Sequence, residues 1–172
     1  MEFISSDTNV WIDFRVISRL SLPFRLPYTY IMYRESIASE LLTPAGFQHE
    51  LTAAGLVSVD ITIEEFILAE SWGNIYPRLS VQDRIALAIA KERKIILLTG
   101  DMALRKAAGK EGVSVLGTIG VLDKLYEGKY ILQDEYEYCL SELLKHNGGE
   151  IRLPSSELKK RLDNLKNKLA DH

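Results

Sequence analysis

Four consecutive large apolar residues, Ile95-Ile96-Leu97-Leu98, constrain the fold of this chain more than any other feature of its sequence. A short run with no polar member is typical of a strand that is buried on both faces of a parallel sheet. The segment before it, from Ser80 to about Lys94, reads as a helix, and its stretch Ile85–Ala90 is apolar all round. Such a helix is expected to be central and covered on most sides. A covered helix followed by a covered strand indicates an α/β fold.

The first 130 residues alternate between strand-like and helix-like segments. Strands are predicted at Phe3–Ser6, Tyr28–Tyr33, Leu56–Ile61, Ile95–Leu98 and Val113–Leu116. Helices are predicted at Val10–Leu20, Glu35–Leu42, Phe47–Ala54, Ile63–Trp72, Ser80–Lys94 and Met102–Ala108. Gly109 is expected to close the last of these helices. Strands separated by helices predict a three-layer α/β/α fold around a central, mostly parallel sheet of five strands, with further helices at the C-terminus.

We assign residues 1–130 to the α/β domain and residues 131–172 to a C-terminal helical extension. The extension contains one helix predicted at Gln133–His146 and a second that begins after Pro154. Four leucines recur in the second helix at spacings of four, three and four residues: Leu158, Leu162, Leu165 and Leu169. This narrow seam fits a helix that packs on its own domain as well as it fits a dimer or partner contact.

Composition and the position of charged residues exclude several classes of protein. No apolar run approaches the ~18 residues of a membrane helix, and the carboxylate of Asp7 follows the first strand too early for a signal peptide. We therefore expect a cytoplasmic protein with no membrane partner. The single Cys139 cannot form an internal disulfide and shows no evident Cys/His pairing, so we expect a packing role.

Two acidic residues follow predicted strands directly. Asp7 follows the first strand and Asp101 follows the most apolar one, in Leu98-Thr99-Gly100-Asp101. Ligands of open parallel sheets bind beyond the carboxyl ends of the strands, so the two carboxylates converge if their strands are neighbours. Each has a structural alternative: Asp101 is also a favoured residue to cap the helix that follows it, and Asp7 is also suited to a local turn.

Asp83 and Glu40 complete the set of candidate catalytic acids. Ser80-Val81-Gln82-Asp83 resembles a capping box with Asp in place of Glu, which is a structural explanation for Asp83. The helix that follows is expected to be covered, however, so a carboxylate in its first turn has reason to face a crevice. Glu40 lies on a short predicted helix, and in isolation it is not distinguishable from a surface glutamate.

Four carboxylates in one crevice repel one another unless a cation neutralises them. Ligands that are all oxygen favour a hard ion, Mg²⁺ or Mn²⁺. Such an ion polarises a phosphodiester and lowers the pKa of bound water, and this chemistry needs no histidine. The three histidines, His49, His146 and His172, show no ligand spacing, so we expect them at the surface.

The chain resembles the PIN-domain family, and within it the small prokaryotic proteins related to VapC-type toxins. The segments that carry the resemblance are Ser6–Val10, Ser39–Leu41, Leu79–Asp83 with the alanine-rich helix after it, Ile96–Ala108 and Gly112–Thr118. The first and last of these are fairly specific in combination and in this order. The resemblance covers about residues 1 to 130.

The resemblance implies an endonuclease that hydrolyses single-stranded RNA with water activated by one or two Mg²⁺ or Mn²⁺ ions. It implies that Asp7, Asp83 and Asp101 bind the metal and that Glu40 is a further ligand or orients the water. Asn9 and Thr99 are implied as supporting polar groups. Many relatives carry a second acid beside the last one; here Gly100 occupies that place, so one of two metal sites is expected to be weaker or missing.

Three basic residues lie near the proposed acids in the sequence: Arg84, Arg105 and Lys106. They are candidates to bind RNA phosphates. Equally, they fit ordinary charges on helix surfaces or partners of the carboxylates when no metal is bound. The formal net charge of −3 argues weakly against nonspecific binding of nucleic acid, although a carboxylate-rich site lowers the total charge without removing local basic patches.

Three hypotheses follow for function. The leading one is a metal-dependent endoribonuclease that acts as the toxin of a toxin–antitoxin pair, with RNA as substrate and an antitoxin or a second copy as partner. The second is a catalytically weak PIN module that binds RNA or protein. The third is a phosphoryl-transfer domain of the receiver or haloacid-dehalogenase kind, which Asp7-Thr8-Asn9 fits poorly because it lacks the second Asp of such phosphatases.

Overall fold

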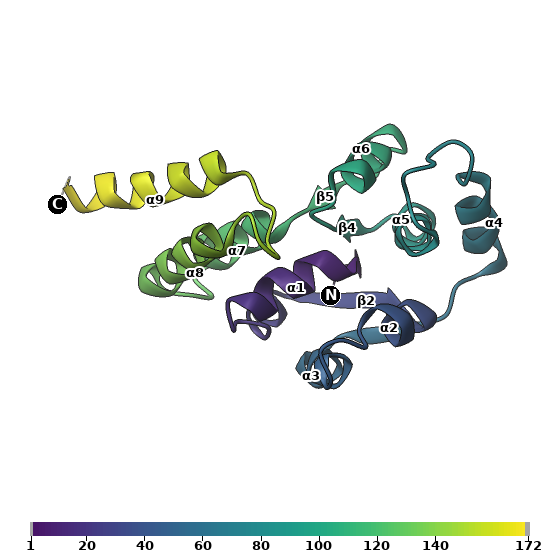
Figure 1. Ribbon diagram of the computed structural model, residues 1–172, viewed down its shortest axis with the longest axis horizontal. Helices are drawn as coiled ribbons and strands as arrows, with labels where there is room; N and C mark the ends of the chain where they lie inside the picture. The colour runs from purple at the N-terminus through teal and green to yellow at the C-terminus, as the bar shows by residue number, and fades with distance from the viewer. Residues whose placement is uncertain (1, 171–172) are drawn as a thin grey trace. The chain divides into compact units, whose positions relative to one another are not determined.

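The structure is a computed structural model that describes residues 2–170 (Figure 1). Its single sheet has five strands in the order β3-β2-β1-β4-β5, and every strand pairs parallel to its neighbours. The strands are β1 (Glu2–Ser6), β2 (Tyr28–Tyr33), β3 (Val57–Val59), β4 (Ile96–Leu98) and β5 (Val115–Leu116). The predicted α/β/α fold is confirmed, and the sheet is wholly rather than mostly parallel.

Nine α-helices and one short 3₁₀ helix accompany the sheet within the described residues. They are α1 (Thr8–Val16), η1 (Leu22–Arg25), α2 (Arg34–Glu40), α3 (Phe47–Ala54), α4 (Ile63–Ser71), α5 (Val81–Arg93), α6 (Met102–Lys110), α7 (Thr118–Glu127), α8 (Gln133–His146) and α9 (Ser155–Ala170). The chain divides into two compact units. Unit 1 runs to Val10 and resumes from Pro27 to Gly117; unit 2 takes Trp11–Leu26 and the chain described from Thr118 on. The boundary that the sequence suggests at residue 130 stays a prediction.

The strand order places the end of β1 at the point where the direction of winding reverses. From β1 the chain builds outward through β2 to β3, and it then returns to the other side of β1 for β4 and β5. Right-handed crossovers place α2 and α3 on one face of the sheet and α4, α5 and α6 on the other (Figure 1). Parallel sheets bind their ligands at the carboxyl edge of such a reversal, which here lies between β1 and β4.

Helix α5 forms the centre of the core of unit 1. Its residues Leu87, Ala88, Ile89 and Ala90 are at most 1% exposed, and it packs against β1, β2 and β4. Leu97 and Leu98 of β4 are fully buried. The predictions of a covered helix followed by a strand buried on both faces are therefore confirmed.

Two predicted helix ends are wrong, and both errors have the same physical reason. The helix expected to reach Leu20 ends at Val16, where Ser18 turns left-handed (φ +57°) and the amide of Arg19 donates to the carbonyl of Phe14. Conversely, α6 continues through Gly109, and Gly112 is the left-handed residue that follows it (φ +73°). At both ends an amide past the helix donates to the carbonyl five positions before it, Arg19 to Phe14 and Val113 to Ala108. The apolar pattern of the sequence does not reveal which residue takes the left-handed turn that this closing motif uses.

Helices α7, α8 and α9 lie in unit 2. Leu158 and Leu165 of the leucine seam are buried within the chain itself and Leu162 is half-buried, whereas Leu169 is 64% exposed. Cys139 of α8 is fully buried, and burial raises the pKa of its thiol to about 12, as befits a packing residue. None of the described helices is long and apolar enough to cross a membrane.

Candidate active site

Asp7 is the most deeply placed of the four candidate acids. Its backbone amide donates to the carbonyl of Leu98 at 2.9 Å, so the pairing of β1 with β4 continues up to this residue. Its carboxylate accepts the amide of Thr8 on Oδ1 and the hydroxyl of Thr99 on Oδ2, both at 2.9 Å. The residue is only 7% exposed. A charged group is thus held at the reversal point of the sheet with neutral donors as its hydrogen-bond partners.

The environment of Asp7 opposes its negative charge. Burial is the main cause that raises the pKa of its carboxyl to about 7; the nearby charges of Asp83 and Glu40 act in the same direction, and the two hydrogen bonds oppose them. A carboxyl with this pKa is only partly ionised near neutral pH. A cation beside it would favour the ionised form, so the site as folded is suited to receive positive charge.

Thr99 joins Asp7 to Asp101. Its hydroxyl donates to Asp7 and accepts the backbone amide of Asp101 at 3.1 Å, and its side chain is fully buried. Asp101 caps α6, because its Oδ1 accepts the amide of Leu104 at 2.8 Å. The capping alternative for Asp101 is therefore correct as a description of its local contact. The cap uses one carboxylate oxygen, and the residue is exposed at the end of β4.

Asp83 also has a structural contact and an electrostatic link to the cluster. It completes a capping box at the start of α5, with its Oδ2 accepting the amide of Ser80 at 3.0 Å. Burial raises the pKa of its carboxyl, and the charge of Asp101 raises it as well. Asp83 is near enough to affect Asp7 and to be affected by Asp101, so it links the two other carboxylates.

Glu40 reaches the cluster through Thr8, a residue that the sequence analysis did not select. The amide of Thr8 donates to Asp7, and its hydroxyl donates to the carboxylate of Glu40. Burial raises the pKa of Glu40, and the charge of Asp83 does so too. The signal that could have identified Thr8 is its position between two selected residues, Asp7 and Asn9.

A hydrogen bond between Asn9 and Gly100 joins the segments that follow β1 and β4. The amide of Gly100 donates to Oδ1 of Asn9 at 3.1 Å. A side chain on Gly100 would have room, since a Cβ there would lie 3.8 Å from Nδ2 of Asn9, an ordinary contact. Asn9 thus holds the loop before Asp101 without filling the space beside it.

A small pocket lies beside Asp7 and Glu40. Its lining includes Ser36 and Gln82, whose side chains are joined by a hydrogen bond of 2.6 Å from the serine hydroxyl to Oε1 of the glutamine. Neither residue could be selected from the sequence, because a lone Ser or Gln on a helix belongs to no motif. Their placement adds neutral hydrogen-bonding groups next to the carboxylates.

The three candidate RNA-binding residues lie in different surroundings. Arg84 donates to the carbonyl of Ala69 at 2.9 Å and so ties α5 to α4. Arg105 donates to the carbonyl of Thr99 at 3.3 Å, beside the end of β4, and Lys106 is exposed on α6. Within residues 2–170, no ion pair joins any lysine or arginine to the four acids. The acids are therefore not neutralised by the protein itself.

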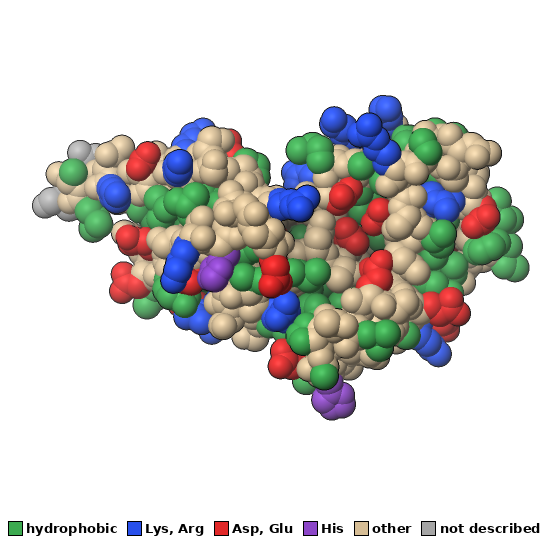
Figure 2. Space-filling model, in the orientation of Figure 1, with side chains coloured by type: hydrophobic (Ala, Val, Ile, Leu, Met, Phe, Trp, Pro, Cys, Tyr) green, Lys and Arg blue, Asp and Glu red, His purple; other side chains and the backbone are tan. Residues whose placement is uncertain are grey.

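Figure 2 shows acidic side chains gathered below the place that α6 occupies in Figure 1. The donor chemistry of Asp7, Asp83 and Asp101 fits a hard divalent cation, because all three offer carboxylate oxygens and repel one another. Their spacing does not form a ready-made site: in the described part of the chain, no group of three acidic, His or Cys side chains is close enough to hold an ion. His49 and His146 are exposed, as expected, and His172 lies outside the described residues.

Comparison with known proteins gives one match. A family model described as DUF3368, PIN domain, matches residues 3–167. No match is found among curated proteins or among solved structures. The matched range contains all four candidate acids and most of each compact unit.

Proposed function

Because this chain belongs to the DUF3368 family of PIN domains, and PIN domains have a nuclease-type fold, we propose that it is a metal-dependent endoribonuclease. In this proposal it hydrolyses phosphodiester bonds of single-stranded RNA. The observation that carries the proposal is the group of mutually repelling carboxylates at the reversal point of the sheet, with Asp7 buried and its pKa raised to about 7. Such perturbed acids in the ligand-binding position of an α/β sheet are typical of functional sites.

We assign Asp7, Asp83 and Asp101 as the residues that hold Mg²⁺ or Mn²⁺, and Glu40 as a further ligand or the group that orients the attacking water. When bound, the ion supplies positive charge that stabilises the developing charge on the phosphodiester and makes water more acidic. Thr8, Thr99 and Asn9 fix the orientation of these side chains through the hydrogen bonds described above. Arg105 lies nearest to the strand ends and is assigned to contact an RNA phosphate.

A finer proposal concerns biological role. The VapC-like motifs suggest the toxin half of a toxin–antitoxin pair that acts in the cytoplasm, with an antitoxin protein and a second copy of the chain as partners. Co-expression with the product of the neighbouring gene tests this: rescue of growth and co-purification of the two proteins support it. Growth arrest that persists beside every neighbouring gene product contradicts it.

A catalytically weak module that binds RNA or protein is the second candidate. The observation that favours it is that the acids are committed to local contacts, with Asp83 and Asp101 capping helices and no three of the described side chains gathered to hold an ion. The absence of a second acid at Gly100 agrees with it.

Cleavage of a mixed RNA pool by the purified chain, with Mn²⁺, with Mg²⁺ and with a chelator, separates the two candidates. Asp101→Asn is the test variant. Asp60→Asn is the matched control, because Asp60 is 73% exposed in its pairing with Arg34. Metal-dependent cleavage that is lost in Asp101→Asn and kept in Asp60→Asn supports the nuclease. Retained cleavage in Asp101→Asn overturns the site assignment, and tight RNA binding without cleavage under any condition favours the binding module.

A further inference from the structure

Helix α9 concentrates positive charge in a chain that is negative as a whole. Between Ser155 and Ala170 it carries five basic and two acidic residues, a net charge of +3, whereas the full chain carries −3. Figure 2 shows Lys and Arg side chains along the surface that α9 occupies in Figure 1. The leucine seam of α9 explains its apolar face and leaves its charged face without a role.

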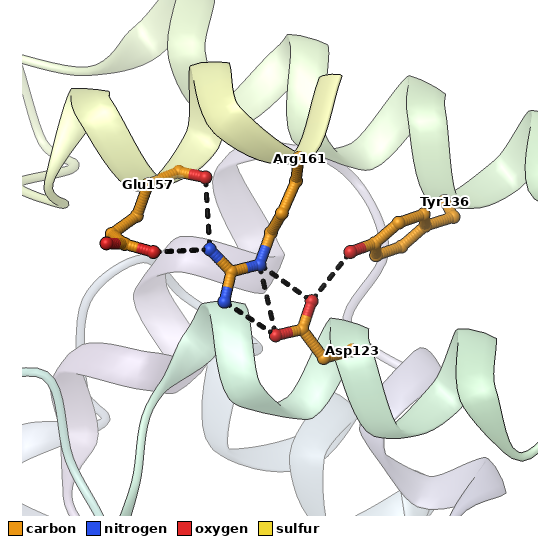
Figure 3. Close-up of polar contacts among 4 residues, drawn as sticks. All are labelled: Asp123, Tyr136, Glu157 and Arg161. Carbon is orange, nitrogen blue, oxygen red and sulfur yellow. Dashed lines mark hydrogen bonds and ion pairs between the residues drawn. The ribbon is translucent and has the colours of Figure 1, made fainter. Parts of the chain in front are cut away.

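An ion-paired network fixes α9 against α7 and α8 (Figure 3). The guanidinium of Arg161 makes hydrogen bonds of 2.8 to 3.0 Å to both oxygens of Asp123 on α7, and it also donates to the carboxylate of Glu157 at 2.7 Å. The hydroxyl of Tyr136 on α8 donates to Asp123 at 2.6 Å. These contacts satisfy Arg161 within the protein, so it holds the helix in place and its charge is not available to a ligand.

The lysines beside this network are exposed and line an open groove between α9 and the α7–α8 pair. Lys160, Asn164, Asn167 and Lys168 line the groove. Spacings of four, seven and eight residues place them on one face of the helix. Lys160 and Lys168 are therefore about 12 Å apart along the helix axis, with two amide side chains between them.

An aromatic pair forms part of the opposite wall of the groove. Tyr126 of α7 is half-buried and stacks on Tyr136 at 4.4 Å between ring centroids, with an interplanar angle of 3°. The ammonium of Lys168 lies 5.7 Å from the ring of Tyr126. Glu127 is an acidic residue of the lining that Arg161 does not neutralise. Cations, amides and a tyrosine ring along one groove are the groups that bind phosphates and bases of a single strand.

A membrane surface fits this helix less well. Amphipathic helices that bind lipid insert an apolar face, but Leu158 and Leu165 are already buried inside unit 2 and Leu169 is the large apolar side chain of α9 that is well exposed. We propose that the groove lined by Lys160, Lys168, Asn164 and Tyr126 is an RNA-binding surface that contacts the phosphates and a base of a single strand. This inference rests on the proposed ribonuclease function and assigns it a substrate contact in unit 2.

Fluorescence anisotropy with a labelled single-stranded RNA of mixed sequence tests the groove. The full chain carries Asp7→Asn and the buffer contains a chelator, so that binding is measured without cleavage. Lys160→Gln with Lys168→Gln is the test pair. Lys159→Gln with Lys166→Gln is the matched control, because it removes the same charge from the same helix at exposed residues that do not line the groove.

We expect the test pair to weaken RNA binding roughly 5- to 10-fold at low salt and to reduce the slope of log affinity against log salt by about 1.4, the value for two phosphate contacts on a single strand. The control pair is expected to change both quantities much less. Tyr126→Leu should weaken binding while Tyr126→Phe keeps it. Equal losses in the test and control pairs, or a polyglutamate peptide that competes as well as RNA of equal charge, would overturn the proposal.

The outcomes separate the groove from the catalytic assignment. RNA binding that is unaffected by the test pair, together with normal metal-dependent cleavage by the otherwise unmodified chain, refutes the groove and leaves the nuclease standing. Groove-dependent RNA binding by a chain that never cleaves RNA supports the groove and moves the function to the binding module.

Discussion

Asp123 of unit 2 and Asp7 of unit 1 are carboxylates with different kinds of partner. In unit 2, both carboxylate oxygens of Asp123 accept hydrogen bonds from the guanidinium of Arg161, and Oδ1 also accepts one from the hydroxyl of Tyr136. In unit 1, Asp7 is more buried than Asp123, yet its hydrogen-bond partners are the neutral Thr8 and Thr99, and its charged neighbours are other acids. One carboxylate has a counter-charge inside the protein; the other does not.

The difference indicates which carboxylate serves the fold and which serves a ligand. An acid paired with arginine adds to the connection between helices, so its presence needs no further explanation. A buried acid among other acids opposes folding, because its charge is neither hydrated nor balanced. A site of this kind is explained if a cation from outside the protein completes it.

Replacing Asp7 by Asn should have the largest effect on activity. The variant keeps the shape of the side chain and one of its two acceptor oxygens but removes the charge that would hold a cation. We expect RNA cleavage to fall by roughly 100-fold or more, while the melting temperature in chelator stays level or rises. Asp13→Asn, which removes a buried carboxylate of unit 2, is the control and should cleave at close to the normal rate. Equal activity in the two variants would refute the comparison.

Replacing Asp123 by Asn should have the opposite profile. The guanidinium of Arg161 would lose its counter-charge while both side chains are only about a quarter exposed. We expect a loss of roughly 2 to 3 kcal/mol in the free energy of unfolding, somewhat below the range for fully buried pairs. Chemical denaturation measures this loss, and Asp163→Asn on the exposed side of α9 is the control. An unchanged denaturation midpoint would mean that the ion pair does not hold α9.

Asp13 is a buried acid of unit 2 whose hydrogen-bond partner is neutral, as the partners of Asp7 are. Thr118 donates its hydroxyl to Asp13 at 2.6 Å, and burial raises the pKa of the carboxyl from 3.8 to about 6 against this hydrogen bond. The folded chain therefore binds this proton more tightly than the unfolded chain does. The stability that Asp13 contributes is highest below pH 4 and is lost as the pH rises to about 6.

We expect the difference in unfolding free energy between the unmodified chain and Asp13→Asn to change by about 1 to 2 kcal/mol between pH 4 and pH 6. Subtracting the two unfolding free energies cancels the pH-dependent contribution that Asp7 makes in both proteins. Denaturation at a series of pH values measures it. Thr118→Val should move the pH range over which this stability is lost to higher pH, because it removes the hydrogen bond that lowers the pKa of Asp13. If the unmodified chain instead gains stability relative to Asp13→Asn between pH 4 and pH 6, the raised pKa of Asp13 is contradicted.

The sequence was sufficient to predict the sheet and its central helix because those features depend on local pattern. The apolar run Ile95–Leu98 and the all-apolar stretch of α5 each correspond to an environment covered on several sides, and the structure confirms both. The ends of α1 and α6 were not predictable in the same way. Ser18 and Gly112 close those helices through left-handed turns, and a serine in that role has no signature that distinguishes it from other serines.

The candidate site shows the same limit. Asp7, Asp83 and Asp101 could be selected because each begins a helix or follows a strand, and both capping alternatives proved to be real contacts as well. Ser36 and Gln82 could not be selected, since they are joined to each other across 46 positions of the chain, and the bond from the hydroxyl of Thr8 to Glu40 spans 32 positions. Local pattern identifies the charged groups of a site, whereas the neutral groups that orient them depend on tertiary contacts.

The smallest expected effect concerns Gly100, the position where many PIN relatives carry a second acid. A Cβ at this position meets Asn9 only at 3.8 to 4.0 Å, and the backbone there is not left-handed, so an aspartate fits without strain. Gly100→Asp adds a carboxylate next to Asp101 and should increase the affinity for Mn²⁺ by roughly 5-fold, since affinity for hard ions rises with the number of charged ligands.

Calorimetric titration with Mn²⁺ measures this affinity, and Gly109→Asp is the control, because it adds the same charge to α6 at a position with open space around it. In chelator, Gly100→Asp should melt slightly below the unmodified chain, because the added charge increases the repulsion among the acids. If the acids of unit 1 share one cation, Gly100→Asp should bind Mn²⁺ more tightly and should also be less stable when no metal is bound. If instead both variants bind Mn²⁺ equally, position 100 does not face the ion, and the carboxylates of unit 1 need another explanation for their lack of a counter-charge.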